Sequence, residues 1–398
     1  MKHSTNRILT THTGSLPRPA DLVDLLNAKE QGEAFERTTF AERIKRAVSD
    51  VVRRQAETGI DVIGDGEHSK VSWMAYARAR LSGLQEIDSP VRFRGATRDS
   101  LAFPQAYEDM KIMLAARSSA IVPKRQVRAQ AFVCSGPVSY VGHAEVQADI
   151  DNLRAALDGV APEEAFITAI SPSNLELYYD NHYYASEEEY LTALADAMRV
   201  EYKAIVESGF ILQIDDPRLA THYNRAVDAS IDDCRRFIAL RVEAVNYALR
   251  GIPEDRVRFH TCYSVNVAPR VHDFELRHFV DLMLKIKAAA YVIEAANPRH
   301  EHEWQIWQDV KLPDGKVLVP GVVSHCIHLV EHPDLVAQRI LRFAGVVGRE
   351  RVIAGTDCGF GTSGAGDEVH PDVAWAKLGA LVEGSRIASR RLWGTKTA

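Results

Sequence analysis

The stretch FILQIDDP, residues 210–217, joins an apolar run to a polar end, and this combination indicates the fold class. Residues 210–214 are apolar apart from Gln213. A short, almost continuously apolar strand is typical of a parallel sheet with both faces covered. Two carboxylates, Asp215 and Asp216, follow the run directly. The stretch therefore predicts a buried parallel strand with carboxylates at its carboxyl end.

The same kind of run recurs along the chain and alternates with helical patterns. The other β-prone runs are residues 61–65, 166–170, 256–260, 291–293, 317–319 and 351–354. The main helical patterns cover roughly residues 40–57, 186–205, 230–249, 274–288, 333–346 and 370–391. Strands that alternate with helices imply a parallel sheet. Seven or eight such units favour an α/β fold of the (β/α)8 TIM-barrel type over an open sheet.

One region interrupts the alternation, from about residue 85 to residue 145. It contains the β-prone runs Val91–Arg94 and Val127–Phe132, which suggest a hairpin and a return strand. The sequence shows no linker, low-complexity segment or internal repeat. We therefore predict a single (β/α)8 barrel domain over residues 1–398, with an inserted excursion near residues 85–145.

The composition restricts the class of protein and its partners. The 398 residues are 46% apolar and 26% charged, with 48 basic and 54 acidic residues and a net charge of −6. The sequence contains no basic block that would indicate nucleic-acid binding. It also contains no run of 18 apolar residues that would indicate a membrane span. The N-terminus has no apolar signal region, and the five cysteines are too sparse for a disulfide framework. We expect a cytoplasmic protein.

Polar side chains follow six of the predicted strands. In a barrel of this kind, the carboxyl ends of the strands form the functional face. Solvated ends would carry Lys and Ser as often as they carry carboxylates, imidazoles and thiols. The six polar ends are Gly64–Glu67, Asp215–Pro217, His260–Cys262, Glu294, Ser324–Cys326 and Gly355–Cys358.

Four of these residues form a candidate zinc site. His260 and Cys262 are two apart on a strand, so their side chains point to the same face. With Glu294 and Cys358 they offer two sulfurs, one nitrogen and one oxygen, a set that suits zinc. A carboxylate ligand can leave when a substrate thiol arrives. Taken alone, the His-x-Cys pair and Cys358 are more often core residues, and Glu294 could form a salt bridge. Only the combination favours a metal.

These residues resemble a known family. His260-x-Cys262, the strand end at Glu294 and Asp357–Gly359 resemble the zinc motifs of the cobalamin-independent methionine synthases. The resemblance also includes the segments TTHTGSLP (10–17), GDGE (64–67), SGPV (135–138) and QIDDP (213–217), all in order along nearly the whole chain. The family fold is a (β/α)8 barrel, and its chemistry is zinc-activated attack of a thiol on an alkyl donor.

The resemblance also implies roles for individual residues. It implies zinc ligation by the four candidate ligands, and binding of the amino acid end of homocysteine by Ser15, Glu67 and Asp215. An ammonium group can pair with Glu67 and Asp215, and backbone N–H groups near Ser15 can receive a carboxylate. His12 lies within the matching N-terminal motif and is a further candidate site residue. Without the resemblance, Glu67 is equally a solvated loop acid and Asp215 equally a helix cap.

Two departures from the family concern the alkyl donor. Family members with two barrels use the second barrel to build the methyltetrahydrofolate site. The length of this chain accommodates a single barrel. At residues 324–326 the usual Asp and His are replaced by Ser324 and Cys326. His325 is shifted by one position, which in a regular strand turns it to the opposite face unless a bulge re-aims it. His325 is our candidate for the catalytic proton transfer, and Cys326 is a candidate spare metal ligand.

The sequence thus predicts a zinc-dependent thiol S-alkyltransferase. The leading reaction is methyl transfer to homocysteine or a similar thiol, as in 5-methyltetrahydropteroyltriglutamate–homocysteine S-methyltransferase. One alternative is an epoxyalkane:coenzyme M-type transferase, and another is a decarboxylase-like or metal-binding barrel without thiol chemistry. The expected partners are a small-molecule thiol and an alkyl donor. A corrinoid carrier protein and a homo-oligomer remain open.

Overall fold

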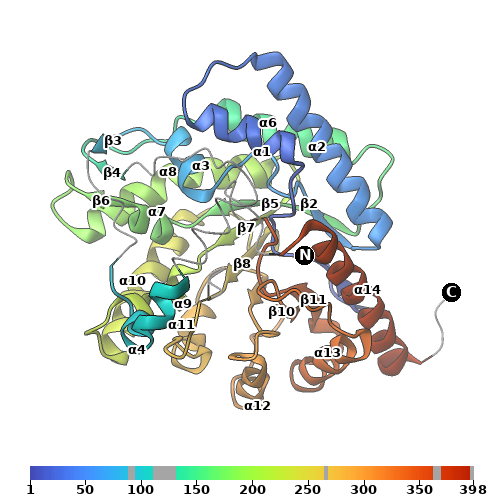
Figure 1. The fold of residues 1–398 in the computed structure, drawn as a ribbon. Helices are drawn as coiled ribbons and strands as arrows, with labels where there is room; N and C mark the ends of the chain where they lie inside the picture. The colour runs from blue at the N-terminus through green and yellow to red at the C-terminus, as the bar shows by residue number, and fades with distance from the viewer. Residues whose placement is uncertain (88–94, 111–130, 264–267, 362–368, 395–398) are drawn as a thin grey trace.

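The computed structural model describes residues 1–87, 95–110, 131–263, 268–361 and 369–394. Eight parallel strands form its central sheet, in the order β1-β11-β10-β9-β8-β7-β5-β2. A parallel bridge between Thr11 and Val62 joins the two ends of this sheet, so the barrel is nearly closed (Figure 1). Its strands are β1 (Leu9–Thr10), β2 (Val62–Gly64), β5 (Glu164–Ile170), β7 (Ile211–Asp215), β8 (Val257–Thr261), β9 (Ala290–Ile293), β10 (Val317–Val323) and β11 (Ile353–Thr356).

The predicted TIM-type barrel is confirmed, with helices around the strands (Figure 1). No helix within the described ranges is long and apolar enough to cross a membrane. The α-helices are α1 (Ala20–Glu30), α2 (Arg37–Thr58), α3 (Trp73–Arg80), α4 (Arg98–Ala102), α6 (His143–Ala156), α7 (Pro172–Tyr178), α8 (Glu187–Glu207), α9 (Arg218–Arg225), α10 (Ile231–Ala248), α11 (Val280–Met283), α12 (Ile306–Asp309), α13 (Pro333–Val347) and α14 (Pro371–Trp393). The 3-10 turns are η2 (Glu254–Arg256), η3 (Leu276–His278), η4 (Glu301–Gln305) and η5 (Arg349–Arg351).

One predicted helix, residues 274–288, is wrong. The segment contains only the turn η3 and the short helix α11 before β9 begins. Its apolar residues do not lie on one exposed helix, because packing buries them on several sides, and tertiary contacts override a local helical pattern. The buried side chains are Phe274, Leu276, Phe279, Val280, Leu282, Met283 and Ile286.

The predicted excursion forms part of a small second sheet. Strand β3 (Leu84–Ile87) pairs antiparallel with β4 (Ala131–Cys134), as a hairpin requires. Strand β6 (Tyr179–Asn181) then pairs parallel with β4. The β-prone run Val91–Arg94 lies outside the described residues, as does 127–130. The excursion therefore leaves the barrel after β2 and returns beside it.

Candidate metal centre

Three of the predicted ligands meet at the carboxyl ends of β8 and β11. The ligand atoms of His260, Cys262 and Cys358 all lie within 4.8 Å of one another, and all three residues are buried. The Cys262 and Cys358 sulfurs are 3.3 Å apart. Within the described residues, Nε2 of His260 has no hydrogen-bond partner. Two sulfurs and a vacant imidazole nitrogen therefore share one buried space.

The His260 ring is oriented from its other nitrogen. Nδ1 of His260 lies 2.5 Å from Oδ1 of Asp215, on the neighbouring strand β7. The same oxygen accepts a hydrogen bond from Nε2 of Gln213 at 2.8 Å. The buried Arg258 donates through Nε to Oε1 of Gln213 at 2.5 Å, so it fixes the direction of the amide. A carboxylate on the far nitrogen of an imidazole is a common arrangement around metal-binding histidines.

The two sulfurs share a proton unequally. A hydrogen bond from the Cys358 thiol lowers the pKa of Cys262 to about 5, against the opposing effect of burial, and nearby His260 lowers it further. The same hydrogen bond, together with burial, raises the pKa of Cys358 well above its ordinary value. One sulfur is therefore a thiolate at neutral pH, and a cation can replace the proton held by the other.

The fourth predicted ligand, Glu294, belongs to a neighbouring group. Its carboxylate, a ring nitrogen of His325 and a carboxylate oxygen of Asp357 lie within 4.8 Å of one another, all buried. Burial, and then the charge of Glu294, raise the pKa of Asp357 to about 8. Glu294 thus belongs to a second polar group, and its charge also acts on Cys262 of the sulfur-rich group.

A register shift brings His325 into this group. The pairing of β10 with β11 is irregular between Gly321 and Val323, as in a β-bulge, just before Ser324. His325 is consequently fully buried, with Nδ1 unpartnered among the described residues, while Cys326 is partly exposed. The Cys326 sulfur lies 2.9 Å from Nε2 of His325. A strand irregularity of this kind re-aims the side chains that follow it, which allows His325 to face the site.

The predicted substrate-binding residues lie next to the sulfur-rich group. Oδ2 of Asp215 is buried and has no partner among the described residues, so it can receive a donor. The buried Glu67 accepts a hydrogen bond from the Thr168 hydroxyl at 3.0 Å. At Gly14, with φ +131°, a Cβ atom would lie only 2.4 Å from Oε1 of Glu67. Glycine is therefore required there for the N-terminal loop to pass the carboxylate.

The Ser15 backbone connects this loop to the segment that follows β11. The carbonyl of Ser15 accepts a hydrogen bond from the Phe360 N–H at 2.9 Å, two residues after Cys358. The Leu16 N–H donates to the Gly66 carbonyl at 3.1 Å. The loop therefore spans the space between the Glu67 turn and the carboxyl end of β11.

Glu67 lies in a setting that favours a bound cation. Burial and the negative charge of Asp215 raise the pKa of Glu67 to about 7, although Lys70 and Arg18 lower it. Glu67 also has a left-handed backbone, with φ 58°. Such strain in a residue other than glycine often marks a functional turn. An arriving ammonium group would relieve the repulsion between the two carboxylates.

His12 has a different environment from the other predicted residues. Its Nε2 lies 2.8 Å from Oε1 of Gln55, and its Nδ1 accepts from the Gly14 N–H at 3.1 Å. Burial lowers its pKa to about 3. Nε2 thus connects the loop after β1 to α2, and Nδ1 bonds within that loop, so both ring nitrogens have partners. His12 is not part of either polar group.

Several residues around the site receive no individual role from the sequence: Gln213, Arg258, Arg270, Asn297 and Asp357. Strand periodicity provides the signal for two of them. Gln213 precedes Asp215 by two positions and Arg258 precedes His260 by two, so each pair faces the barrel interior together. Arg270 and Asn297 lie in loops after β8 and β9, where no periodicity applies.

The donor set fits a zinc ion. In a tetrahedral site, a zinc–sulfur distance of about 2.3 Å separates two sulfurs by about 3.8 Å. The observed 3.3 Å is within a small adjustment of that value. The vacant Nε2 of His260 supplies a third donor, and soft sulfur with imidazole selects zinc over magnesium or calcium.

Comparisons with known proteins show what the chain is similar to. Residues 8–170 match the family model described as the catalytic domain of cobalamin-independent synthase. A methionine synthase of Thermococcus kodakarensis is 25% identical over 386 residues, covering 96% of this chain and 94% of the relative. A methionine synthase of Saccharolobus solfataricus is 25% identical over 390 residues, covering 96% and 95%.

A solved structure shares the fold along the whole chain. The B12-independent methionine synthase of Shewanella sp. W3-18-1, in complex with selenomethionine, superposes with a TM-score of 0.69. The superposition covers 97% of this chain and 99% of the other, at 17% identity. At this identity the likeness supports the fold alone.

Proposed function

Because this chain is related to the cobalamin-independent methionine synthases, we propose that it is a zinc-dependent methyltransferase acting on the thiol of homocysteine or a similar amino-acid thiol. One observation carries the zinc part. The Cys262 and Cys358 sulfurs, 3.3 Å apart, share a buried space with the vacant nitrogen of His260. We assign these three residues and Glu294 as the metal ligands.

The ligand residues define what the site does for the thiol. Zinc, when bound, keeps a ligated thiol deprotonated at neutral pH while leaving it nucleophilic. Asp215 holds the His260 ring in place through Nδ1 and leaves Nε2 for the ion. Glu294 is the ligand that we expect to exchange with the arriving thiol, because it lies outside the group formed by the other three.

The neighbouring carboxylates favour an amino-acid thiol. An ammonium group can contact both Glu67 and the unpartnered Oδ2 of Asp215. Backbone N–H groups of the loop at Ser15 would receive the carboxylate of the same substrate. A thiol that bears a sulfonate in place of the ammonium would gain nothing from these two acids. This arrangement orients the sulfur toward the donor, and alignment of two reactants supplies much of the rate enhancement.

His325 is our candidate for proton transfer. In the reaction the thiol loses its proton, a sulfur–carbon bond forms, and the bond between methyl and its carrier breaks. If the carrier is a folate, its leaving nitrogen takes up a proton, whereas a corrinoid or a small sulfonium donor leaves without one. His325 and Asp357 form a buried pair next to Glu294 that can hold such a proton. The variant His325→Gln should lower kcat while leaving zinc content unchanged.

The identity of the donor decides which carrier leaves. A methyl-folate, a methylated corrinoid carrier and a small methylated metabolite are the three candidates. Incubation of zinc-loaded protein with homocysteine and each donor in turn, with methionine as the measured product, separates them.

Zinc content tests the proposal directly. We expect about one zinc per chain by mass spectrometry of the gently purified protein, and clear loss in Cys358→Ser. The matched control is Cys234→Ser, a buried free thiol in α10 outside the site. Less than about half a zinc per chain in the parent protein would contradict the proposal.

The acceptor is tested by X-ray absorption at the zinc edge. Addition of homocysteine should produce one more zinc–sulfur contact. Turnover with coenzyme M but not with homocysteine would instead favour the epoxide-opening alternative.

A further inference from the structure

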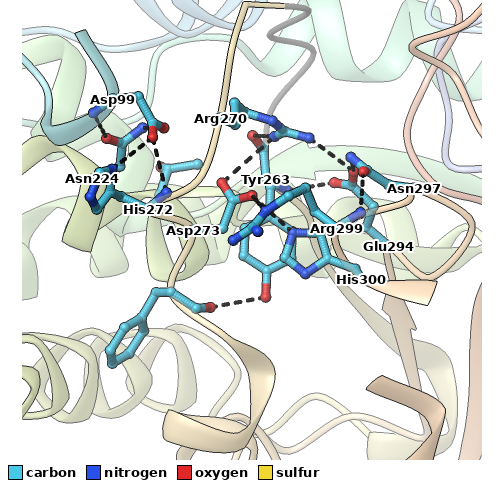
Figure 2. Close-up of polar contacts among 12 residues, drawn as sticks. Asp99, Asn224, Tyr263, Arg270, His272, Asp273, Glu294, Asn297, Arg299 and His300 are labelled. Carbon is cyan, nitrogen blue, oxygen red and sulfur yellow. Dashed lines mark hydrogen bonds and ion pairs between the residues drawn. The ribbon is translucent and has the colours of Figure 1, made fainter. Parts of the chain in front are cut away.

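The Glu294 carboxylate, just after β9, already has two hydrogen-bond donors and one ion-pair partner within the protein. Oε2 accepts from the Tyr263 N–H at 2.8 Å, and Oε1 accepts from Nδ2 of Asn297 at 2.7 Å. Nη2 of Arg270 lies 3.5 Å from Oε1, and both charged side chains are almost inaccessible to solvent. Figure 2 shows Arg270 and Asn297 on either side of this carboxylate. Glu294 is therefore electrostatically compensated without a metal ion.

Arg270 connects this carboxylate to the strand end that carries the thiolate. Its Nη1 donates to the carbonyl of Tyr263 at 2.8 Å, and Tyr263 directly follows Cys262. The Tyr263 ring stacks on His300, with ring centroids 3.6 Å apart. Its hydroxyl donates to the Phe274 carbonyl at 2.9 Å. Arg270 thus contacts a well-packed residue on one side and Glu294 on the other.

The segment that carries Arg270 is anchored by the excursion. Oδ1 of Asp99, in α4, accepts from the N–H groups of Val271 and His272 at 2.8 and 2.9 Å. It also lies 3.0 Å from Nδ1 of His272. Oδ2 of Asp99 accepts from Asn224 at 2.8 Å, so the carboxylate is saturated (Figure 2). A residue outside the barrel therefore holds the backbone immediately after Arg270.

We propose that Arg270 is a positioning residue that competes with the metal ion for Glu294, and that Asp99 holds Arg270 in place for that role. A buried carboxylate without a partner is strongly destabilising. Arg270 and Asn297 give Glu294 a compensated position when it is not bound to the ion. They therefore lower the cost of removing it from the metal, which makes Glu294 the exchangeable ligand. This inference rests on the proposed metal site and deepens it.

The test compares zinc retention in Arg270→Met, which removes the charge and keeps most of the volume. Zinc transfer from loaded protein to a coloured chelator is followed over time. Without Arg270, Glu294 loses its best compensation off the metal. Transfer should therefore slow by about tenfold, which corresponds to about 1.4 kcal/mol. Arg270→Lys should stay close to the parent protein.

A double-mutant cycle assigns the effect to Glu294. In a Glu294→Gln background, Arg270→Met should leave zinc transfer unchanged, because the carboxylate for which Arg270 and the ion compete is absent. Arg235→Met is the matched control. Arg235 in α10 pairs with Asp281 in α11 at 2.8 Å, beyond the segment that carries Arg270, and its loss should not affect zinc transfer. Asp99→Ala should slow transfer in the same direction as Arg270→Met.

The outcomes separate this inference from the metal site itself. Faster zinc loss in Arg270→Met would mean that Arg270 supports the metal site, and an unchanged rate would mean that it does not act on Glu294. Either result overturns the inference while the metal site stands. A parent protein without zinc would overturn the metal site instead. Thermal unfolding of each metal-free variant identifies any that fail to fold.

Discussion

Oδ1 of Asp215 lies 2.5 Å from Nδ1 of His260, and the other oxygen of the same carboxylate is buried without a partner in the described part of the chain. The Asp215 carboxylate therefore has one oxygen at the proposed metal site and one at the proposed ammonium site. It orients a proposed metal ligand with one oxygen and faces the proposed ammonium site with the other. Glu67 faces that site as well, but no hydrogen bond connects it to His260. The two acids are thus separable by mutation.

We predict that Asp215→Asn weakens zinc binding by about 10- to 100-fold, as is usual for the loss of a carboxylate behind a metal-binding imidazole. It should also raise the KM for homocysteine, because the charge facing the ammonium is lost. Glu67→Gln is the control. It should raise the KM without changing zinc affinity, as measured by chelator competition. Equal zinc affinity in both variants would mean that the contact between Asp215 and His260 does not stabilise the metal site.

The raised pKa of Glu67 predicts a pH dependence of stability. Its pKa rises from 4.5 to about 7 in the folded protein, mainly because of burial. Between these pH values the folded state holds a proton that the unfolded state has lost, so stability falls as pH increases. The full shift corresponds to a cost on the order of 3 kcal/mol above pH 7. Glu67→Gln should therefore raise Tm at pH 8 and have little effect near pH 4.5.

The measurement is thermal unfolding of both proteins across this pH range in the absence of thiol. Added homocysteine should reduce the difference at pH 8, because its ammonium compensates the ionised carboxylate. A difference in Tm that is constant between pH 4.5 and 8 would show that Glu67 titrates with an ordinary pKa.

The proximity of the two sulfurs predicts an oxidation reaction. Cys262 and Cys358 are 3.3 Å apart, and Cys262 is largely ionised at neutral pH because its pKa is about 5. After a chelator removes the metal, diamide should oxidise the two thiols to one disulfide, and the diamide takes up the two electrons and two protons. Thiol titration should fall from five groups per chain to three, and dithiothreitol should restore all five. Zinc-loaded protein and Cys358→Ser should resist this change.

Much of the fold follows from the sequence alone. Buried apolar runs such as 210–214 are strands because a parallel sheet buries both of their faces. Strand β1 escaped prediction because it contains only two residues, too few for any periodicity. The segment 274–288 is not a single helix, although its apolar residues have helix-like spacing, because they are buried on several sides.

The site was predictable where it lies on strands and unpredictable where it lies in loops. His260 and Cys262 were recognised as neighbours from the two-residue period of β8. The direction of His325 depends on an irregular pairing near Gly321, which leaves no local signature in the sequence. The contact of Arg270 with Glu294 depends on Asp99, 171 positions earlier in the chain, and no short-range rule reveals such a contact.

The close approach of β10 to the metal-ligand strand provides a final prediction. A Cβ atom on Gly321 would lie 2.1 Å from Oδ1 of Asp357 and 2.6 Å from its Cα atom. Oδ1 of Asp357 accepts from the N–H groups of Ala295 and Ala296, so it cannot move away freely. We expect Gly321→Ala to destabilise the protein by about 1–3 kcal/mol, as for other overpacked cores. Because Asp357 precedes Cys358, zinc binding should weaken as well.

Gly345→Ala is the matched control for this substitution. Gly345 lies in α13, and a Cβ atom there would meet nothing within 4 Å. Alanine should therefore stabilise the helix by about 0.5–1 kcal/mol and leave zinc content unchanged. Urea unfolding of the metal-free proteins measures the first effect, and chelator competition measures the second. If Gly321→Ala kept both its parental stability and its parental zinc affinity, the packing of Asp357 against β10 would have no part in holding Cys358 in place.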